Sequence, residues 1–392
     1  MERPATRDSR QYSLPTVVEN INSRSTSKSR IYHLKSDLAR ELDEAVASAL
    51  AEAGRTAAWR TYNGPKQASL TEHLRDVTGC ANIGLASSGS AALEMILRAF
   101  RLPPGSEVLL AGYDYPGNFA AVERAGARPA LVDVEKASWN LAIESLNAVV
   151  SPNCRALIVS HLHGQLQPIA HLHQWCRERK IRLIQDACQA LGATIEGRVI
   201  GELGDATVFS FGGSKVISGG RGGAWATNDP ELAQHSRLAA GVGSGPYELS
   251  ELQATAILAQ LPFLDRITAR CRAYFRHQAS VLAATCPELS APWLADLNQT
   301  AFYQAGWILP DALSANSLME LSQSQHAEHE HIGIGSGFPG YHRRSPRRCR
   351  IDSPLRNTPS IARTTLTVHY RAALSDLPVA EVIAKLVNAL CK

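Results

Sequence analysis

Residues 184–193 read Ile-Gln-Asp-Ala-Cys-Gln-Ala-Leu-Gly-Ala, and residues 204–223 read Gly-Asp-Ala-Thr-Val-Phe-Ser-Phe-Gly-Gly-Ser-Lys-Val-Ile-Ser-Gly-Gly-Arg-Gly-Gly. In each piece a short apolar run, of the kind that forms a buried strand, leads to a residue with chemical function. The first run leads to Asp186. The second leads to Lys215, which stands among glycines and serines that leave room for a ligand. The two pieces therefore predict a carboxylate and an amine at the exits of two strands.

Strand-like and helix-like segments alternate around this stretch. Strands are predicted at 83–86, 107–110, 130–132, 157–159, 182–185, 207–211 and 224–227, and helices at 66–78, 91–100, 119–125, 169–179, 230–239 and 250–260. This alternation indicates an α/β fold in which helices cover both faces of a mostly parallel sheet. Ligands of such sheets bind beyond the carboxyl ends of the strands. We expect Ser88, Tyr115, Asp186 and Lys215 at that end.

The length of 392 residues predicts two domains, because one core rarely serves so long a chain. Residues 1–30 are rich in Ser, Arg, Thr and Asn and are expected to form a mobile arm. Residues 31–265 should form a large α/β domain that begins with a helix near 34–53. Residues 266–392 should form a smaller C-terminal α+β domain, with strands near 302–309 and 362–368 and a last helix at 379–390.

Composition argues against several other classes of protein. The formal charge of +4 is small for this length, so nucleic acid is not the expected partner. The eight cysteines form no Cys-x-x-Cys pair, which favours reduced thiols over a zinc site. His326, His329 and His331 are interpreted as a surface cluster, and no metal is expected. No membrane span or secretory signal is visible, so a cytoplasmic location is the expectation.

A phosphate site is predicted where Ser88, Gly89 and Ser90 follow a strand and open a helix. Free backbone amides and the helix dipole favour an anion there, and the serines add hydroxyl donors. Ser210, at the end of another strand, is a further candidate. An ordinary N-cap serine beside a glycine turn is the simpler interpretation of this segment taken alone.

Asp186 and Lys215 together suit pyridoxal phosphate, which has a cationic ring nitrogen and an aldehyde. Asp186 would keep the ring nitrogen protonated, because an opposite charge favours the charged form. Gln189 could hydrogen-bond the ring hydroxyl, and Tyr115 could stack on the ring. Taken singly, Asp186 could be a capping acid, Tyr115 a core aromatic and Lys215 a surface charge.

The ordered motifs resemble the DegT/DnrJ/EryC1/StrS family of sugar aminotransferases. The similarity is visible from about residue 63 to 259. The segments that carry it are Ser87-Ser88-Gly89-Ser90-Ala91-Ala92-Leu93, Asp186-Ala187-Cys188-Gln189, Gly204-Asp205-Ala206-Thr207-Val208-Phe209-Ser210-Phe211 leading to Lys215, and Ser250-Glu251-Leu252-Gln253-Ala254. The resemblance implies the fold-type I architecture, with a mostly parallel sheet of the seven-stranded type sandwiched by helices.

The resemblance also implies an activity and roles for single residues. Lys215 would bind the cofactor aldehyde and shuttle protons, with Asp186 at the ring nitrogen. The cofactor contacts would come from Ser88, Gly89, Ser90, Tyr115, Gln189 and Ser210. A homodimer with sites at the subunit interface would transfer an amino group from glutamate or glutamine to a keto sugar. That sugar is expected to be nucleotide-linked, in polysaccharide or secondary-metabolite biosynthesis.

The chain departs from the family pattern at Val216, Arg221, Pro246 and Glu248, which leaves other α-carbon chemistry or a non-catalytic regulator as alternatives. The run Arg343-Arg344-Ser345-Pro346-Arg347-Arg348-Cys349-Arg350 is interpreted as a solvated loop. The alternative is a contact with the diphosphate of a nucleotide-linked sugar, because arginine forks match phosphate geometry.

Overall fold

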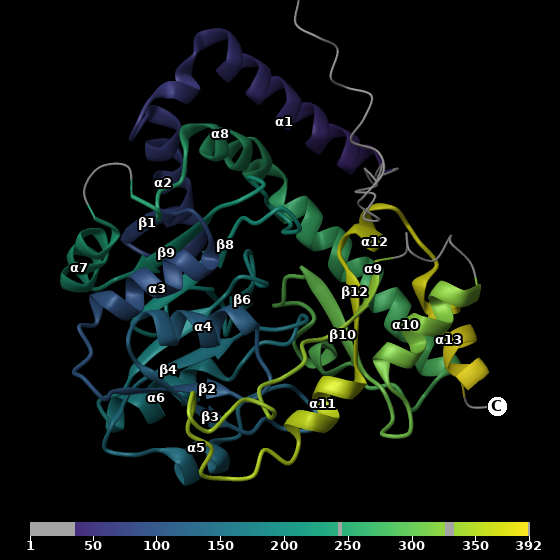
Figure 1. The fold of residues 1–392 in the computed structure, drawn as a ribbon. Helices are drawn as coiled ribbons and strands as arrows, with labels where there is room; N and C mark the ends of the chain where they lie inside the picture. The colour runs from purple at the N-terminus through teal and green to yellow at the C-terminus, as the bar shows by residue number, and fades with distance from the viewer. Residues whose placement is uncertain (1–35, 242–244, 326–332, 391–392) are drawn as a thin grey trace, which may run out of the picture. The chain divides into compact units, whose positions relative to one another are not determined.

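A seven-stranded sheet forms the centre of the fold (Figure 1). Its strands lie in the order β1 (Asn82–Ala86), β9 (Gly223–Thr227), β8 (Ala206–Ser210), β5 (Arg182–Asp186), β4 (Cys154–Ser160), β2 (Glu107–Ala111) and β3 (Arg128–Val132). Only β9 runs against its two neighbours within this sheet. The other neighbouring strands pair in parallel, which confirms the predicted mostly parallel sheet.

The structure is a computed structural model and describes residues 36–241, 245–325 and 333–390. The predicted arm and the cluster of His326, His329 and His331 lie outside the described residues. The division of the chain near residue 265 stays a prediction. None of the described helices is long and apolar enough to cross a membrane.

The helices largely match the predicted ones. They are α1 (Asp37–Thr56), α2 (Pro65–Thr78), α3 (Gly89–Ala99), α4 (Pro116–Arg124), α5 (Ile143–Val149), α6 (Ile169–Glu178), α7 (Pro230–Ala240), α8 (Glu251–Gln260), α9 (Leu264–Thr285), α10 (Ala315–Gln325), α11 (Thr358–Thr364), α12 (Arg371–Leu374) and α13 (Val379–Leu390). A second sheet has the order β10 (Gln304–Ile308), β12 (Thr365–His369) and β11 (Ile334–Ser336), and a small hairpin pairs β6 (Thr194–Ile195) with β7 (Arg198–Val199). Sequence patterns did not predict the helices α5, α10, α11 and α12 or the strands β6, β7 and β11.

The central strands are buried on both faces, as continuous apolar runs indicate. In β2 the side chains of Val108 and Leu110 belong to one core, which also holds residues of α3 and α4. Leu109 belongs to a second core on the opposite face, which holds residues of α5, α6 and the second sheet. Successive strand residues alternate in direction, so one apolar run supplies both cores.

The first residues of α8 cap their own helix and also hydrogen-bond the start of α2. Ser250 and Gln253 form a reciprocal capping box at the N-terminus of α8. Glu251 is buried, and its two carboxylate oxygens accept hydrogen bonds from the backbone amides of Lys66 at 2.6 Å and Gln67 at 3.0 Å. The carboxylate satisfies amides that the first turn of α2 leaves without partners. The Ser250–Ala254 motif therefore has a structural role in this chain.

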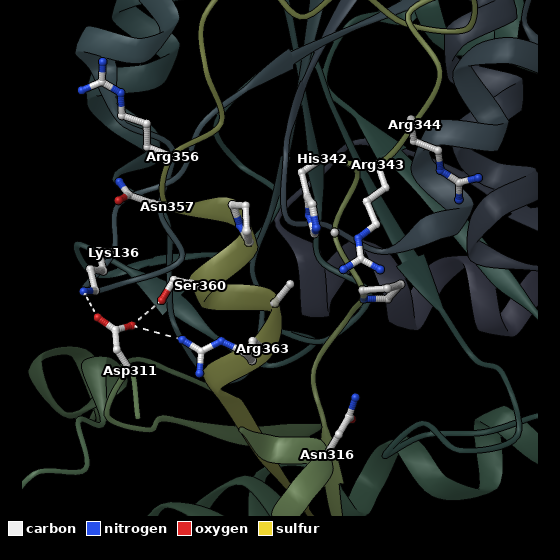
Figure 2. A pocket seen from close by; sticks show the side chains of 14 residues that line it. Lys136, Asp311, Asn316, His342, Arg343, Arg344, Arg356, Asn357, Ser360 and Arg363 are labelled. Atoms are coloured by element: carbon white, nitrogen blue, oxygen red, sulfur yellow. Dashed lines mark hydrogen bonds and ion pairs between the residues drawn. The ribbon is translucent and has the colours of Figure 1, made fainter. Parts of the chain in front are cut away.

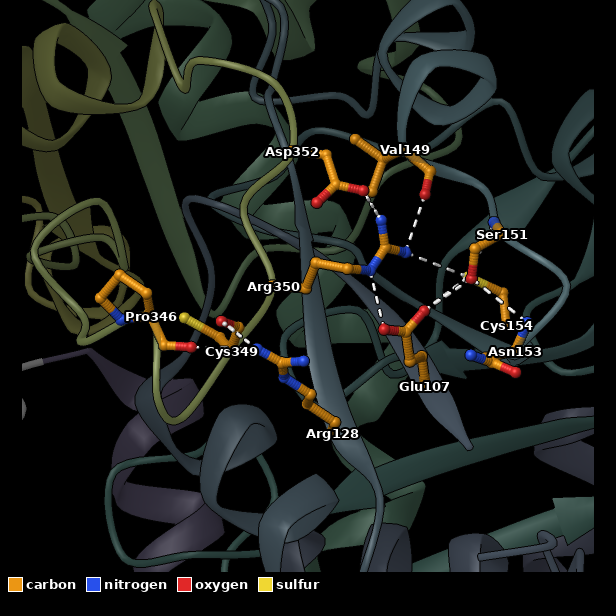
Figure 3. A network of polar contacts seen from close by, with 10 residues as sticks. All are labelled: Glu107, Arg128, Val149, Ser151, Asn153, Cys154, Pro346, Cys349, Arg350 and Asp352. Atoms are coloured by element: carbon orange, nitrogen blue, oxygen red, sulfur yellow. Dashed lines mark hydrogen bonds and ion pairs between the residues drawn. The ribbon is translucent and has the colours of Figure 1, made fainter. Parts of the chain in front are cut away.

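The basic run at 343–350 is only partly a solvated loop, and the prediction is wrong for Arg350. Its guanidinium bonds Glu107 at 2.7 Å and the carbonyl of Val149 at 2.8 Å, and it pairs with Asp352 (Figure 3). The backbone of Arg350 also pairs with β3, at its edge. Burial opposes both charges of the pair. The hydrogen bonds of the pair outweigh this effect of burial, so the pKa of Glu107 is lowered and the pKa of Arg350 is raised.

Arg350→Ala is expected to lower the free energy of unfolding by about 3 kcal/mol, because it leaves the buried carboxylate of Glu107 without its cation. Urea denaturation of the purified protein measures this loss. Arg347→Ala removes an exposed arginine of the same run and should change stability by less than about 0.5 kcal/mol. Equal stabilities of the two variants would contradict the structural role of Arg350.

Candidate functional site

The carboxyl ends of β1, β8, β5, β4 and β2 meet at one end of the seven-stranded sheet. The antiparallel strand β9 begins at this end, where Gly223 pairs with both Ala86 of β1 and Ser210 of β8. A Cβ atom on Gly223 would lie 2.3 Å from the carbonyl carbon of Ser88. Only glycine allows β9 to start so close to the turn that follows β1.

The predicted phosphate site has the geometry of an anion cradle. Ser88 caps α3, and its hydroxyl accepts a hydrogen bond from the amide of Ala91 at 3.0 Å. The amides of Gly89 and Ser90 begin the helix and have no acceptor inside it. A Cβ atom on Gly89 would lie 3.0 Å from the Cβ of Ser210. The structure therefore brings together Ser88, Gly89 and Ser210, and the simpler N-cap interpretation of Ser88 holds as well.

Lys215 lies beside a small cavity that Gln189 and Ser210 also line. Its side chain is half-buried, and its Nζ lies 3.9 Å from the centre of the Tyr303 ring. The Tyr303 hydroxyl is 2.9 Å from the hydroxyl of Ser214. The Tyr303 ring thus contacts the amine of Lys215 in the segment that follows β8.

Asp186 ends β5 and is buried, with 5% of its surface exposed. The side-chain amide of Asn118 donates to its Oδ2 at 2.8 Å, and the backbone amide of Cys188 donates to its Oδ1 at 2.9 Å. Gln189 accepts from the amide of His163 at 3.0 Å through its Oε1. Among the described residues, none accepts from the Gln189 Nε2, so that group remains available to a ligand.

Tyr115 is 45% exposed and packs its ring edge-to-face with Phe338, with the ring centres 5.8 Å apart. Its ring lies against Gly117, where a Cβ atom would be 2.2 Å from Tyr115 Cε1 and 2.8 Å from Ser90 Oγ. Ser90 and Tyr115 therefore adjoin the same glycine. The exposed part of Tyr115 is available to cover a planar ligand.

Two histidines beside the site are buried and uncharged near neutral pH. Burial lowers the pKa of His161 to about 4 and that of His163 to about 3. His163 Nε2 lies 2.9 Å from the hydroxyl of Tyr113, and His161 Nε2 lies 3.1 Å from Gln185 Oε1. Both therefore hold neighbouring polar groups in place.

The sequence did not single out Asp114, Asn118, Tyr303 or Phe338, which the fold adds to the site. Asn118 lies in the first turn of α4, which follows the predicted Tyr115, and this position was its only signal. Tyr303 and Phe338 come from distant parts of the chain, and no local pattern connects them with Lys215 or Tyr115.

The departures from the family pattern lie around the site. Val216 lines the same cavity as Lys215, while Arg221 is exposed. The carbonyl of Pro246 accepts from the Ser87 hydroxyl at 3.0 Å, and the next carbonyl in the chain accepts from the Ser87 amide at 2.7 Å. These bonds use backbone acceptors, so the altered side chains of 246–248 leave the segment anchored beside the cradle.

A basic cavity of about 950 Å³ is lined by residues of the segments 339–344 and 356–363, together with Lys136, Asp311 and Asn316 (Figure 2). The charged residues that line it are Lys136, Asp311, Arg343, Arg344, Arg356 and Arg363. Asp311 pairs with Lys136 and, at 3.7 Å, with Arg363. Arg343, Arg344 and Arg356 have no carboxylate partner among the described residues. The cavity therefore has an excess of positive charge.

The described residues contain no group of three His, Cys, Asp or Glu side chains that could hold a metal ion. The cysteines that the structure describes form no disulfide bond. The site instead offers an anion cradle, a buried carboxylate and a half-buried amine along one end of the sheet. These groups can hold a phosphorylated ring with a cationic nitrogen and present an aldehyde to an amine.

Residues 40–387 match the DegT/DnrJ/EryC1/StrS aminotransferase family. The chain is 34% identical over 202 residues to GDP-perosamine synthase of Caulobacter vibrioides, which covers 48% of this chain and 54% of that protein. It is 31% identical over 261 residues to L-glutamine:2-deoxy-scyllo-inosose aminotransferase of Streptomyces kanamyceticus, covering 60% of each. The chain spans about half the length of the curated relatives it matches.

The fold is similar to the crystal structure of DesI in the presence of its TDP-sugar product. The TM-score is 0.75 at 23% identity, and the superposition covers 88% of this chain and 90% of DesI. This likeness shows the fold-type I architecture that the family resemblance implied.

Proposed function

The chain belongs to the DegT/DnrJ/EryC1/StrS aminotransferase family, and from this premise we propose that it is a pyridoxal phosphate-dependent aminotransferase acting on a keto sugar. The amino donor is glutamate or glutamine. The observation that carries the proposal is the placement of Lys215, Gln189 and Ser210 around one cavity, with Asp186 buried at the end of a neighbouring strand.

The residues of the site fit the cofactor. The amides of Gly89 and Ser90, with the Ser210 hydroxyl, would hold its phosphate. Asp186 would hold the ring nitrogen, and the free amide of Gln189 would donate to the ring oxygen. The exposed face of Tyr115 would cover the ring. When bound, pyridoxal phosphate supplies an electron-withdrawing ring that makes the α-proton of an amino acid removable.

The chain itself would supply nucleophile and proton carrier. Lys215 would bind the aldehyde and, once displaced by the amino donor, carry a proton to and from the substrate carbon. The Tyr303 ring beside its Nζ would limit the positions of the free amine. Asn118 and the amide of Cys188 would keep the Asp186 carboxylate facing the ring.

A two-stage experiment tests this proposal. The protein loaded with pyridoxal phosphate should lose its visible absorbance when glutamate or glutamine is added, and a panel of keto sugars and keto cyclitols should restore it. Loss without recovery on any acceptor would point to other α-carbon chemistry. A spectrum that no donor changes would favour the non-catalytic cofactor-binding alternative.

We propose that the acceptor is nucleotide-linked and that the basic cavity holds its diphosphate. The support is the excess of arginine over carboxylate in that cavity. Its wall also adjoins the cofactor position, because Pro339 lines it and the preceding residue, Phe338, packs on Tyr115. The names of similar proteins, such as GDP-perosamine synthase, agree with an acceptor of this class.

Arg356→Ala is expected to raise the KM for a nucleotide-linked keto sugar roughly 10-fold or more, because a charged hydrogen bond to phosphate is lost. Steady-state kinetics should show an unchanged KM for the amino donor and a kcat close to that of the parent protein. Arg347→Ala, an exposed arginine outside the cavity, is the control. An equal effect of the two substitutions would exclude this diphosphate site.

We also propose a homodimer, as expected from the family. Sedimentation equilibrium measures it directly, and a monomer at micromolar concentration would contradict it.

A further inference from the structure

Two buried carboxylates, one of them proposed to hold the ring nitrogen, share one amide group. Asp114 follows β2, Asp186 ends β5, and the Asn118 Nδ2 donates to Asp186 Oδ2 at 2.8 Å and to Asp114 Oδ2 at 3.2 Å. The Ser160 hydroxyl lies 3.1 Å from the same nitrogen. Asp114 has no exposed surface and Asp186 has 5%. A single amide group therefore bridges two acids that are almost wholly buried.

This pair has no cationic partner among the described residues that surround it. Asp114 also accepts a hydrogen bond from the backbone amide of Tyr115 at 2.7 Å. The titratable neighbours of the pair are Tyr113, His161, Cys188 and Tyr341, and Lys215 acts electrostatically on Cys188 but is not among the groups that shift the pKa of Asp114. Burial raises the pKa of both tyrosines and of the Cys188 thiol and lowers the pKa of His161 to about 4. All four groups are thus uncharged at neutral pH.

Two buried carboxylates without a cation do not both stay ionised, because each disfavours the charge of the other. Burial, followed by repulsion from Asp186, raises the pKa of Asp114 to about 7. Asp186 accepts hydrogen bonds from Asn118 at 2.8 Å and from the amide of Cys188 at 2.9 Å. Below about pH 7, Asp114 therefore holds a proton.

We propose that Asp114 is a positioning residue that holds a proton in the cofactor-free protein and releases it to solvent when a cationic ring nitrogen binds at Asp186. The incoming positive charge offsets the repulsion that Asp186 exerts on Asp114, so Asp114 loses its proton. One O–H bond of Asp114 breaks, and the proton passes to the buffer. This inference rests on the proposed function, because it requires a cationic ring at Asp186.

Calorimetric titration with pyridoxamine 5′-phosphate tests the proton release. This ligand has the same ring nitrogen and no aldehyde to react with Lys215. Titration at pH 6 in two buffers of different ionisation enthalpy should show that the parent protein releases about one more proton than Asp114→Asn. Asp296 is another acid whose pKa is raised by burial, and it lies in the segment Pro292–Asp296. The Asp296→Asn control should release as many protons as the parent protein. Equal release by the parent protein and Asp114→Asn would overturn the proposal.

Inorganic phosphate is the ligand control, because it occupies the cradle without a ring. Its binding should release the same number of protons from the parent protein and from Asp114→Asn. A difference between the two proteins with phosphate alone would assign the proton to the cradle and contradict the role of Asp114.

The cofactor-free protein provides a second measurement that does not depend on the proposed function. The folded pKa of Asp114 lies above its ordinary value of 3.8, so its stabilising contribution is complete below pH 3.8 and is lost as the pH rises through about 7. The midpoint of thermal unfolding should therefore fall between pH 5 and pH 8 by more in the parent protein than in Asp114→Asn. Parallel pH profiles would refute the proton on Asp114. If pyridoxamine 5′-phosphate does not bind but the pH profiles of the two proteins differ, the aminotransferase proposal is refuted. The proton on Asp114 would still be supported.

Discussion

Lys215→Ala is expected to reduce amino transfer by roughly 10³-fold or more, because the protein loses both its nucleophile and its proton carrier. The measurement is kcat/KM with glutamate or glutamine, together with the visible spectrum of the protein after addition of pyridoxal phosphate. Lys385→Ala, which removes an exposed lysine of α13, is the matched control and should keep full activity.

Lys215→Arg separates the chemistry of this residue from its charge. A guanidinium can keep the contact with the Tyr303 ring, but it stays protonated and is no nucleophile. We expect it to be as inactive as Lys215→Ala. Substantial turnover by either variant would contradict the assignment of Lys215, whatever the effect on cofactor affinity.

Asp186→Asn should lower kcat/KM by roughly 10²–10³-fold, the usual loss when one placed electrostatic group is removed from a catalytic site. A neutral amide no longer favours the protonated ring nitrogen, so the ring withdraws electrons less strongly. Bound cofactor should also dissociate faster, which dialysis followed by absorbance measures.

Asp296→Asn is again the control for the loss of an acid outside the site. In the Asp186→Asn protein the Asn118 amide could turn to suit the new side chain, and thermal unfolding will detect any loss of packing. An Asp186→Asn protein with parent-like turnover would place the ring nitrogen elsewhere.

The central sheet could be predicted because its strands are buried on both faces. The continuous apolar run of β2 indicates a buried strand, because a surface helix of the same length would contain polar residues on its exposed face. The C-terminal part was harder to predict. Its strand β11 is three residues of Ile, Gly and Ser, and α11 and α12 are short, so neither periodicity nor length marks them.

In the candidate site, too, some residues could be predicted from the sequence and others could not. Ser88, Asp186 and Lys215 each follow an apolar run, so their position at the carboxyl end of the sheet could be read from the sequence. Asp114 also follows a predicted strand, but only the strand order β5-β4-β2 and the bridging Asn118 bring it to Asp186. Tyr303 meets Lys215 only through the tertiary fold. Long-range contacts between isolated residues leave no local pattern.

The position of β9 between β1 and β8 determines when the anion cradle can assemble. In the seven-stranded sheet β1 pairs with β9 alone, and β9 follows every other strand of that sheet in the chain. During synthesis, β1 and the turn at Ser88 must therefore wait until residue 227 has left the ribosome before they can join the sheet. Contacts between distant segments also form slowly during refolding, because loop closure costs entropy. The capacity to bind phosphate should thus be among the last properties that the nascent or refolding sheet acquires.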